Sequence, residues 1–497
     1  MTPTWGTARV LAGPLLAALL FLLLPEEYRS GAGAQIVFTT AGRATLAVMS
    51  WMAVWWLTEA VDISVTALLP LVLFPLLGIA PIEDAARPYA HPLIFLFMGG
   101  FILALSMQRW GLDRRIALQT LRIVGPEPTR MIGGFMLVTA SLSMFVSNTA
   151  TAAMMLPIGL SVIALARNEP SADSPSPPGS PERNFALALL LGIAYSASIG
   201  GIGTIIGTPP NALLVGFARD SIGEAHRLDI SFARWLAVGL PLVLVFLPVA
   251  WLLLTRVIFP VRLAVIPGGA SFFRERLAEI GSPGRGEITT LAVFACTALA
   301  WVTRPLLAHF VPLSDAGIAM TGALLLFVLP VNRAGRRFAM DWKTARRLPW
   351  GILILFGGGL SLAARVQEHG VAEFIGSLVA GLPALPDALL VASVALLVIF
   401  LTELTSNTAT TATMLPILAA LAPGLGVDPY LLIVPAALAA SCAFMMPVAT
   451  PPNAIIFGSG MVTIPEMCRA GFWLNLAGVL LITILTLLVV RPVLGVS

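Results

Sequence analysis

The fold is decided by the stretch Ser147-Asn148-Thr149-Ala150-Thr151-Ala152-Ala153-Met154-Met155-Leu156-Pro157-Ile158. It returns 259 residues later as Ser406-Asn407-Thr408-Ala409-Thr410-Thr411-Ala412-Thr413-Met414-Leu415-Pro416-Ile417, with ten of the twelve positions identical. A second motif, Thr208-Pro209-Pro210-Asn211-Ala212, returns 242 residues later as Thr450-Pro451-Pro452-Asn453-Ala454. The two offsets differ by 17 residues, which is the length of the polar insert 167–183 that only the first copy carries. The chain is therefore a duplicated unit.

The composition is that of a membrane protein. Of the 497 residues, 58% are hydrophobic and only 11% are charged, with a mean hydropathy of +0.93. Soluble domains carry about 25% charged residues, so an ordinary soluble enzyme is excluded. Long apolar runs also argue against a transmembrane β-barrel, whose strands would alternate over about ten residues. The fold class predicted here is an all-α polytopic membrane protein.

Apolar runs of sufficient length predict about eleven transmembrane helices. They lie near 9–25, 43–58, 63–80, 91–108, 186–216, 233–256, 287–303, 313–331, 349–365, 430–458 and 470–490. Two further segments, 131–166 and 387–421, are each long enough for a pair of short helices, which we predict to be re-entrant hairpins. Each repeat then has five crossings, over 43–256 and 287–490, and an odd number inverts the second copy relative to the first. Inverted repeats with interrupted helices are typical of secondary transporters.

The distribution of positive charge predicts the orientation. Most of the 29 Lys and Arg residues lie in segments that are inside if the N-terminus is cytoplasmic, which satisfies the positive-inside rule. The C-terminus should then lie outside. Because the basic residues are in loops between spans, the net charge of +4 gives no reason to expect nucleic acid as a partner. The scattered cysteines Cys296, Cys442 and Cys468 have no metal-ligand spacing.

The repeated motifs are suited to ions. The Ser-Asn-Thr triplet offers hydroxyl and amide oxygens without charge, and it lies where two short helices meet and expose unpaired backbone groups. Neutral oxygens satisfy a hard cation such as sodium, whereas helix N-termini attract anions. The Pro-Pro pairs break a spanning helix and free its carbonyl groups. One such motif could simply end a helix, but two copies in register favour a symmetric binding site.

Charge is scarce in this predicted site. The triplets and the Thr-Pro-Pro-Asn motifs contain no Lys, Arg or His, so a bound dianion would need cations beside it. Glu403 is the notable acid within the membrane, and its repeat counterpart is Met144. Two roles are open for Glu403 at this point: coupling to protons, or anchoring the hairpin through hydrogen bonds.

Paired Ser-Asn-Thr motifs, each followed by a Pro-Pro-Asn helix break, resemble the divalent anion:sodium symporter (DASS) family over about residues 43–490. The resemblance implies a homodimeric elevator transporter of dicarboxylates, citrate or sulfate, usually driven by sodium ions. It implies one sodium site at Ser143, Ser147, Asn148 and the Gly207 carbonyl, and a second at Thr402, Ser406, Asn407 and the Ala449 carbonyl. Substrate carboxylates would meet a larger set: Ser147, Asn148, Thr149, Thr208, Pro209, Ser406, Asn407, Thr408, Thr450 and Pro451.

The same resemblance divides the chain into scaffold and transport parts. The predicted parts are an N-terminal transmembrane helix (1–42), the scaffold part of repeat 1 (43–130), the transport part of repeat 1 (131–260, with hairpin 131–166 and broken helix 186–216), a cytoplasmic connector (261–286), the scaffold part of repeat 2 (287–386) and the transport part of repeat 2 (387–497, with hairpin 387–421 and broken helix 430–458).

The function predicted from all of this is sodium-coupled symport of small dicarboxylates across the bacterial inner membrane. The partners are the dicarboxylate, at least two sodium ions, the lipid bilayer and a second copy of the chain. No organic cofactor is expected, and the chain is not expected to be an enzyme, because it carries no polar catalytic cluster. The alternatives are a sodium-independent dicarboxylate exchanger, a sulfate or other inorganic anion carrier, a sodium/proton antiporter using Glu403, and a channel.

Overall fold

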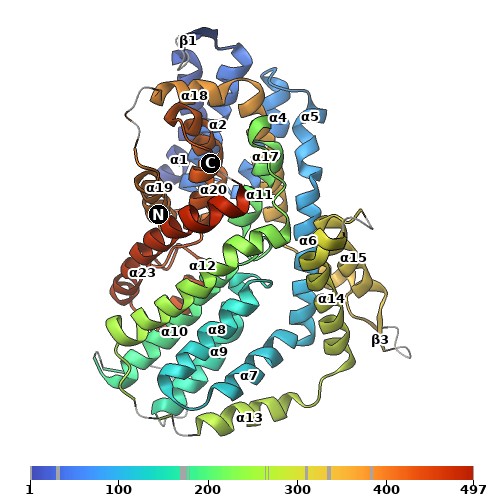
Figure 1. Cartoon of the computed structure of the whole chain (residues 1–497), viewed down its shortest axis with the longest axis vertical. Helices are drawn as coiled ribbons and strands as arrows, with labels where there is room; N and C mark the ends of the chain where they lie inside the picture. Colours follow the sequence, from blue (N-terminus) through green and yellow to red (C-terminus); the bar gives the residue numbers. More distant parts are fainter. Residues whose placement is uncertain are drawn as a thin grey trace.

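The computed structural model describes residues 3–29, 34–167, 176–177, 179–263, 265–266, 268–307, 312–332, 337–380, 383 and 385–495. These residues are mostly helical, and the helices are arranged as in Figure 1. Two short antiparallel hairpins, which the sequence patterns did not predict, join helices at their ends: β1 (Glu27–Arg29) with β2 (Gln35–Val37), and β3 (Pro330–Asn332) with β4 (Arg337–Phe338).

The predicted scaffold segments form one set of elements. After α1 (Pro3–Leu23), those of repeat 1 are α2 (Thr40–Thr58), α3 (Ile63–Thr66), α4 (Leu69–Leu76), α5 (Ile82–Ala86), η1 (Arg87–Ala90), α6 (Pro92–Trp110) and α7 (Leu112–Val124). Those of repeat 2 are α14 (Arg285–Leu307), α15 (Asp315–Val328), α16 (Trp342–Ala345), α17 (Trp350–Glu368) and α18 (Val371–Val379). Helix α6 packs against α15, so the two repeats meet in this part of the molecule.

The predicted transport segments form a second set. In repeat 1 they are α8 (Pro128–Ser143), α9 (Asn148–Arg167), α10 (Pro181–Gly201), α11 (Pro209–Asp220), η2 (Glu224–His226), α12 (Phe232–Leu252) and the π-helical η3 (Leu253–Ile258). In repeat 2 they are α19 (Asp387–Thr402), α20 (Asn407–Leu425), α21 (Tyr430–Ala440), α22 (Pro451–Gly458), α23 (Ile464–Leu485), the π-helical η4 (Thr486–Val490) and α24 (Arg491–Leu494). The connector contains α13 (Gly269–Ile280), which packs beside α7 (Figure 1).

Both predicted helix interruptions are present. Helix α10 ends at Gly201 and α11 begins at Pro209, while α21 ends at Ala440 and α22 begins at Pro451. Proline fits the first turn of a helix, where its missing N–H costs nothing, but it cannot continue a helix from the preceding residues. We call 202–208 the first break and 441–450 the second break. Both predicted helix pairs are present too, with hairpin tips at 144–147 and 403–406.

Eight helices of the described residues are long and apolar enough to cross a membrane, and five shorter apolar helices accompany them. One of these five, Ile63–Leu76, covers most of the expected span over 63–80 and consists of two short helices, α3 and α4, because Pro70 starts a new helical turn within this apolar run. The count of eleven crossings, the re-entrant depth of the hairpins and the domain boundaries stay predictions.

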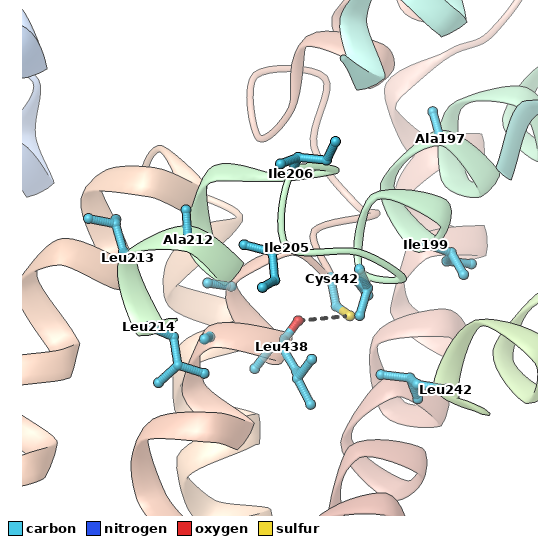
Figure 2. Close-up of a cluster of buried hydrophobic side chains, with 14 of the residues drawn as sticks. Ala197, Ile199, Ile205, Ile206, Ala212, Leu213, Leu214, Leu242, Leu438 and Cys442 are labelled. Atoms are coloured by element: carbon cyan, nitrogen blue, oxygen red, sulfur yellow. Dashed lines mark hydrogen bonds between the residues drawn. The ribbon is translucent and has the colours of Figure 1, made fainter. Parts of the chain in front are cut away.

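The two breaks share one apolar core. Figure 2 shows Ile205 of the first break and Cys442 of the second break within the same buried cluster, where the Cys442 thiol donates to the Leu438 carbonyl at 3.4 Å. Nearly all of α10 is buried, and it contacts α8, α9 and α22. A broken backbone packed on all sides in this way has little freedom to shift.

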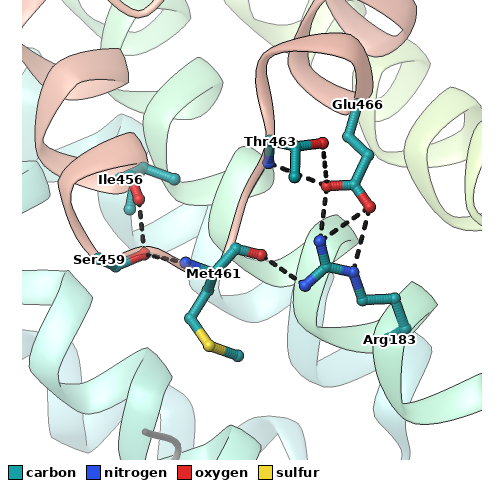
Figure 3. Close-up of polar contacts among 6 residues, drawn as sticks. All are labelled: Arg183, Ile456, Ser459, Met461, Thr463 and Glu466. Atoms are coloured by element: carbon teal, nitrogen blue, oxygen red, sulfur yellow. Dashed lines mark hydrogen bonds and ion pairs between the residues drawn. The ribbon is translucent and has the colours of Figure 1, made fainter. Parts of the chain in front are cut away.

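A half-buried ion pair joins the predicted transport segments of the two repeats. Arg183 at the start of α10 donates to both carboxylate oxygens of Glu466 at the start of α23, at 2.6 to 3.1 Å, and to the Met461 carbonyl at 2.7 Å (Figure 3). Glu466 also accepts from the Thr463 N–H and completes the capping box that starts α23.

Candidate functional site

A single cavity of about 890 Å³ brings the two repeats together. All ten residues predicted to meet substrate line it: Ser147, Asn148, Thr149, Thr208, Pro209, Ser406, Asn407, Thr408, Thr450 and Pro451. They come from two hairpin tips and two breaks that lie far apart in the sequence. The family resemblance implied these ten residues, and the paired motifs favoured one symmetric site; the structure places all ten around one volume.

Four helices begin at this cavity. Helices α9 and α20 start at Asn148 and Asn407, and α11 and α22 start at Pro209 and Pro451. The N-terminus of a helix carries partial positive charge and unpaired N–H groups. Helix N-termini of this kind are suited to an anion, and neither motif adds a cationic side chain.

The residues predicted for the first sodium site form a compact group of oxygens. The fully buried Ser143 hydroxyl lies 2.6 Å from Asn148 Oδ1 and 2.7 Å from the Ala197 carbonyl oxygen. Asn148 Oδ1 and the Gly207 carbonyl oxygen both lie within 3.2 Å of the position that a Cβ atom on Gly201 would occupy. Neutral oxygens gathered at an unwound helix are the donor set that transporters use for sodium.

The residues predicted for the second site repeat this geometry. The fully buried Thr402 hydroxyl lies 2.8 Å from Asn407 Oδ1 and 3.2 Å from the Ala440 carbonyl oxygen. Ser406, Asn407 and Ala449 line the cavity, as Ser147, Asn148 and Gly207 do in the first repeat. Neither Ser143 nor Thr402 lines it, so each hydroxyl lies behind an asparagine that separates it from the open volume.

Two asparagines of the repeated motifs hold the breaks, a role that motif spacing did not reveal. Asn211 Nδ2 donates to the carbonyls of Gly201, Ile202 and Thr204, at 2.7 to 3.2 Å. Its counterpart Asn453 donates to the carbonyls of Ala443 and Met446, both at 3.1 Å. Both asparagines are fully buried and stabilise carbonyls that the broken helices leave without intrahelical partners.

The opposite wall of the cavity consists of residues that the sequence did not single out. Helix α6 contributes Phe101, Ala104, Leu105 and Gln108, which recur at helical spacing. Glu59 and Arg347 are the charged residues among those that line the cavity in the described part of the chain. Glu59 ends α2 with a left-handed φ of 47°.

Near this wall, Arg109 at the end of α6 forms an ion pair with Asp341 at 2.6 Å. Asp341 also accepts from the Thr344 N–H at 2.8 Å. That backbone hydrogen bond and the Arg109 guanidinium lower the pKa of the Asp341 carboxyl below its ordinary value. The negative charge of Asp341 thus fixes the end of α6 to the segment that leads into Arg347.

Comparisons with known proteins agree with this architecture. Residues 33–496 match the sequence model of the family described as the sodium:sulfate symporter transmembrane region. The chain belongs to this family. Membership confirms the predicted resemblance to the DASS symporters, and it places the chain among transporters and not enzymes.

Within the family, the chain is similar to two proteins named sodium-dependent dicarboxylate transporter SdcS. The one from Staphylococcus saprophyticus is 42% identical over 495 residues, which cover 98% of this chain and 92% of the relative. The one from Staphylococcus aureus is 42% identical over 501 residues, covering 99% and 93%.

Solved structures of transporters have a similar fold. The YdaH transporter of Alcanivorax borkumensis matches with a TM-score of 0.59 at 13% identity, covering 99% of this chain and 98% of that one. MtrF of Neisseria gonorrhoeae, described among antimetabolite efflux pumps, matches with a TM-score of 0.58 at 14% identity, covering 97% and 95%. At these identities the likeness concerns the fold alone.

Proposed function

We propose that this chain is a sodium-coupled symporter of small dicarboxylates such as succinate, malate and fumarate. It acts across the bacterial plasma membrane as a homodimer, with the N-terminus in the cytoplasm and the C-terminus outside. The transport parts of both repeats move against the scaffold parts by an elevator motion and carry the cavity with them.

The observation that carries this proposal is the chemistry of the cavity. Four helix N-termini and neutral side-chain groups of both repeats line one volume, and the two repeated motifs bring no cationic side chain to it. A dicarboxylate has two negative charges, and helix N-termini alone offset each of them only in part. Sodium ions at Asn148 and Asn407 complete the neutralisation, so binding of ion and substrate becomes interdependent.

Dicarboxylate is the preferred substrate class for two reasons. The relatives from both staphylococci bear the name dicarboxylate transporter. In addition, threonine is the third residue of both triplets, at Thr149 and Thr408, which in the DASS family favours dicarboxylates over sulfate.

The proposed resting state is open to the cytoplasm. The wall of the cavity includes Glu59 and Arg347, and the predicted topology places both of their segments at the cytoplasmic surface. Substrate would leave past Arg347, whose positive charge compensates for the attraction lost as the dianion moves away from the helix N-termini.

The test is uptake of labelled succinate into proteoliposomes, with an inward sodium gradient against a potassium control, each with and without unlabelled succinate inside. We expect uptake that needs sodium and proceeds into an empty lumen. Uptake that does not depend on sodium and requires internal succinate would instead make the chain an exchanger. Uptake of labelled sulfate that unlabelled succinate does not inhibit, together with no uptake of labelled succinate, would make it a carrier of inorganic anions.

The proposed sites have their own test. Asn148→Ala and Asn407→Ala each remove an oxygen that ion and substrate share, so we expect either variant to abolish uptake while the protein still elutes as a folded dimer. Sodium dependence like that of the wild type in either variant would contradict the assignment of that asparagine.

A further inference from the structure

Glu403 lies at the tip of the second hairpin and binds the second break. Its side chain is buried, with 3% of the residue exposed. Oε1 accepts from the backbone N–H groups of Phe444 and Met445, at 2.7 and 2.9 Å, and Oε2 accepts from that of Met446 at 2.9 Å. Asn475 of α23 donates a fourth hydrogen bond to Oε1 at 2.8 Å. One carboxyl group thus fixes three successive residues of the broken helix.

The first repeat joins the same two positions with the opposite chemistry. At the repeat offsets, Met144 corresponds to Glu403 and Thr204 corresponds to Met446. The fully buried Thr204 hydroxyl donates to the Met144 carbonyl. In repeat 1 a side chain of the break binds the backbone of the tip, and in repeat 2 a side chain of the tip binds the backbone of the break. We call these two contacts the tip–break ties.

The local backbone explains why the chemistry differs. In the first break, the N–H groups of Ile202 and Gly203 still bond to Ile199 and Gly200, at 3.2 and 2.9 Å. The second break leaves the helical path earlier, and the corresponding N–H groups of Phe444 and Met445 donate to Glu403 instead. A buried N–H needs an acceptor, and a carboxyl group can serve three of them at once.

The break residue of each tie is hydrogen-bonded through its backbone to a residue whose carbonyl is proposed to bind sodium. The Gly207 N–H donates to the Thr204 carbonyl at 3.3 Å, and the Ala449 N–H donates to the Met446 carbonyl at 3.2 Å. Asn211 and Asn453 bond to the same two carbonyls, at 2.7 and 3.1 Å. On the other side, each tip residue directly follows a proposed sodium ligand, Ser143 or Thr402.

We propose that Thr204 and Glu403 are positioning residues, each of which holds the two halves of one sodium site at the correct separation. Thr204 serves the site of Ser143, Asn148 and Gly207, and Glu403 serves the site of Thr402, Asn407 and Ala449. Neither side chain needs to touch the ion. The inference rests on the proposed function, because it concerns the ions of that same transporter.

The test compares Thr204→Val, Thr204→Ser and Glu403→Gln with the wild type. Valine has the shape of threonine without the hydroxyl, serine keeps the hydroxyl, and glutamine replaces an acceptor with a donor that faces backbone N–H groups. Sodium binding is measured on purified protein without substrate, by calorimetry, and sodium half-saturation is measured by succinate uptake. Loss of a buried hydrogen-bonded tie should weaken sodium binding about tenfold in Thr204→Val and in Glu403→Gln.

Three variants separate positioning from general stability. Thr204→Ser should bind sodium within about twofold of the wild type, and the double variant Thr204→Val with Glu403→Gln should show the product of the two single effects if each tie serves its own site. Glu466→Gln weakens the half-buried ion pair with Arg183, away from the tips, so it should lower the melting temperature without changing sodium affinity.

The outcomes are distinct. Unchanged sodium affinity in both Thr204→Val and Glu403→Gln overturns the inference. So does sodium binding that is weakened in Thr204→Ser and Glu466→Gln as much as in Thr204→Val. If Glu403→Gln does not fold, Thr204→Val against Thr204→Ser decides the matter alone. A wild-type protein that neither binds sodium nor needs it for uptake overturns the proposed function and this inference together.

Discussion

Gly201 is the glycine at which a single methyl group should damage the site without damaging the fold. It ends α10, and a Cβ atom at this position would lie 2.7 Å from Asn148 Oδ1 and 3.2 Å from the Gly207 carbonyl oxygen. Its repeat counterpart, Ala443, already carries a methyl group. Alanine is a better helix former than glycine, so we expect Gly201→Ala to fold.

The size of the effect follows from these distances. The Asn148 amide must move by roughly 0.7 Å to reach an ordinary van der Waals separation from the new methyl group. Directed away from Ser143, this movement lengthens the 2.6 Å contact between Asn148 Oδ1 and the Ser143 hydroxyl to about 3.3 Å and weakens it. It also exceeds the tolerance of about 0.2 Å typical of metal-ligand distances. A loss of about 1–2 kcal/mol corresponds to a five- to thirtyfold increase in the sodium concentration at half-saturation.

The assay is a sodium titration of labelled succinate uptake, with Gly359→Ala as the matched control. Gly359 lies within α17, and a Cβ atom there would lie 3.6 Å from its nearest neighbour, Leu213, which is an ordinary contact. We expect the control to match the wild type. Half-saturation of Gly201→Ala within twofold of the wild type, in a folded protein, would refute the view that a rigid Asn148 amide binds the ion.

Two further predictions concern stability. Arg183→Ala leaves the Glu466 carboxylate without its buried partner, which costs about 2 kcal/mol of folding stability. The melting temperature should therefore fall, while the sodium concentration at half-saturation of uptake stays unchanged. A changed half-saturation would show that this ion pair shapes the site. Gly424→Ala places a Cβ atom 2.1 Å from the Gly376 carbonyl oxygen and should separate α20 from α18, so the melting temperature should fall in a thermal shift assay. Gly458→Ala is the control, because a Cβ atom there would have no neighbouring atom within 4 Å. Equal melting temperatures of the two variants would contradict the close contact between α18 and α20.

Local features made much of the architecture predictable. The Pro-Pro pairs end helices wherever they occur, so the breaks before Pro209 and Pro451 follow from backbone chemistry alone. Helix α7 likewise carries apolar residues at helical spacing, and Leu112, Leu118 and Leu121 form its buried face. The hairpin β1–β2 had no such signal, since its exposed strands of three residues are too short to show a period.

The sequence by itself determined that the chain is duplicated, that it is a helical membrane protein with two broken helices, and which neutral oxygens each copy brings. These properties are local or repeated, and they can be read from spacing and residue type. The two copies in register favoured one symmetric site, but only the tertiary structure decided that Glu59, Gln108 and Arg347 form the opposite wall of its cavity, and that Glu403 and Thr204 hold equivalent positions together. The physical reason is that these contacts join residues far apart in the chain, where no periodic pattern records which helix faces which.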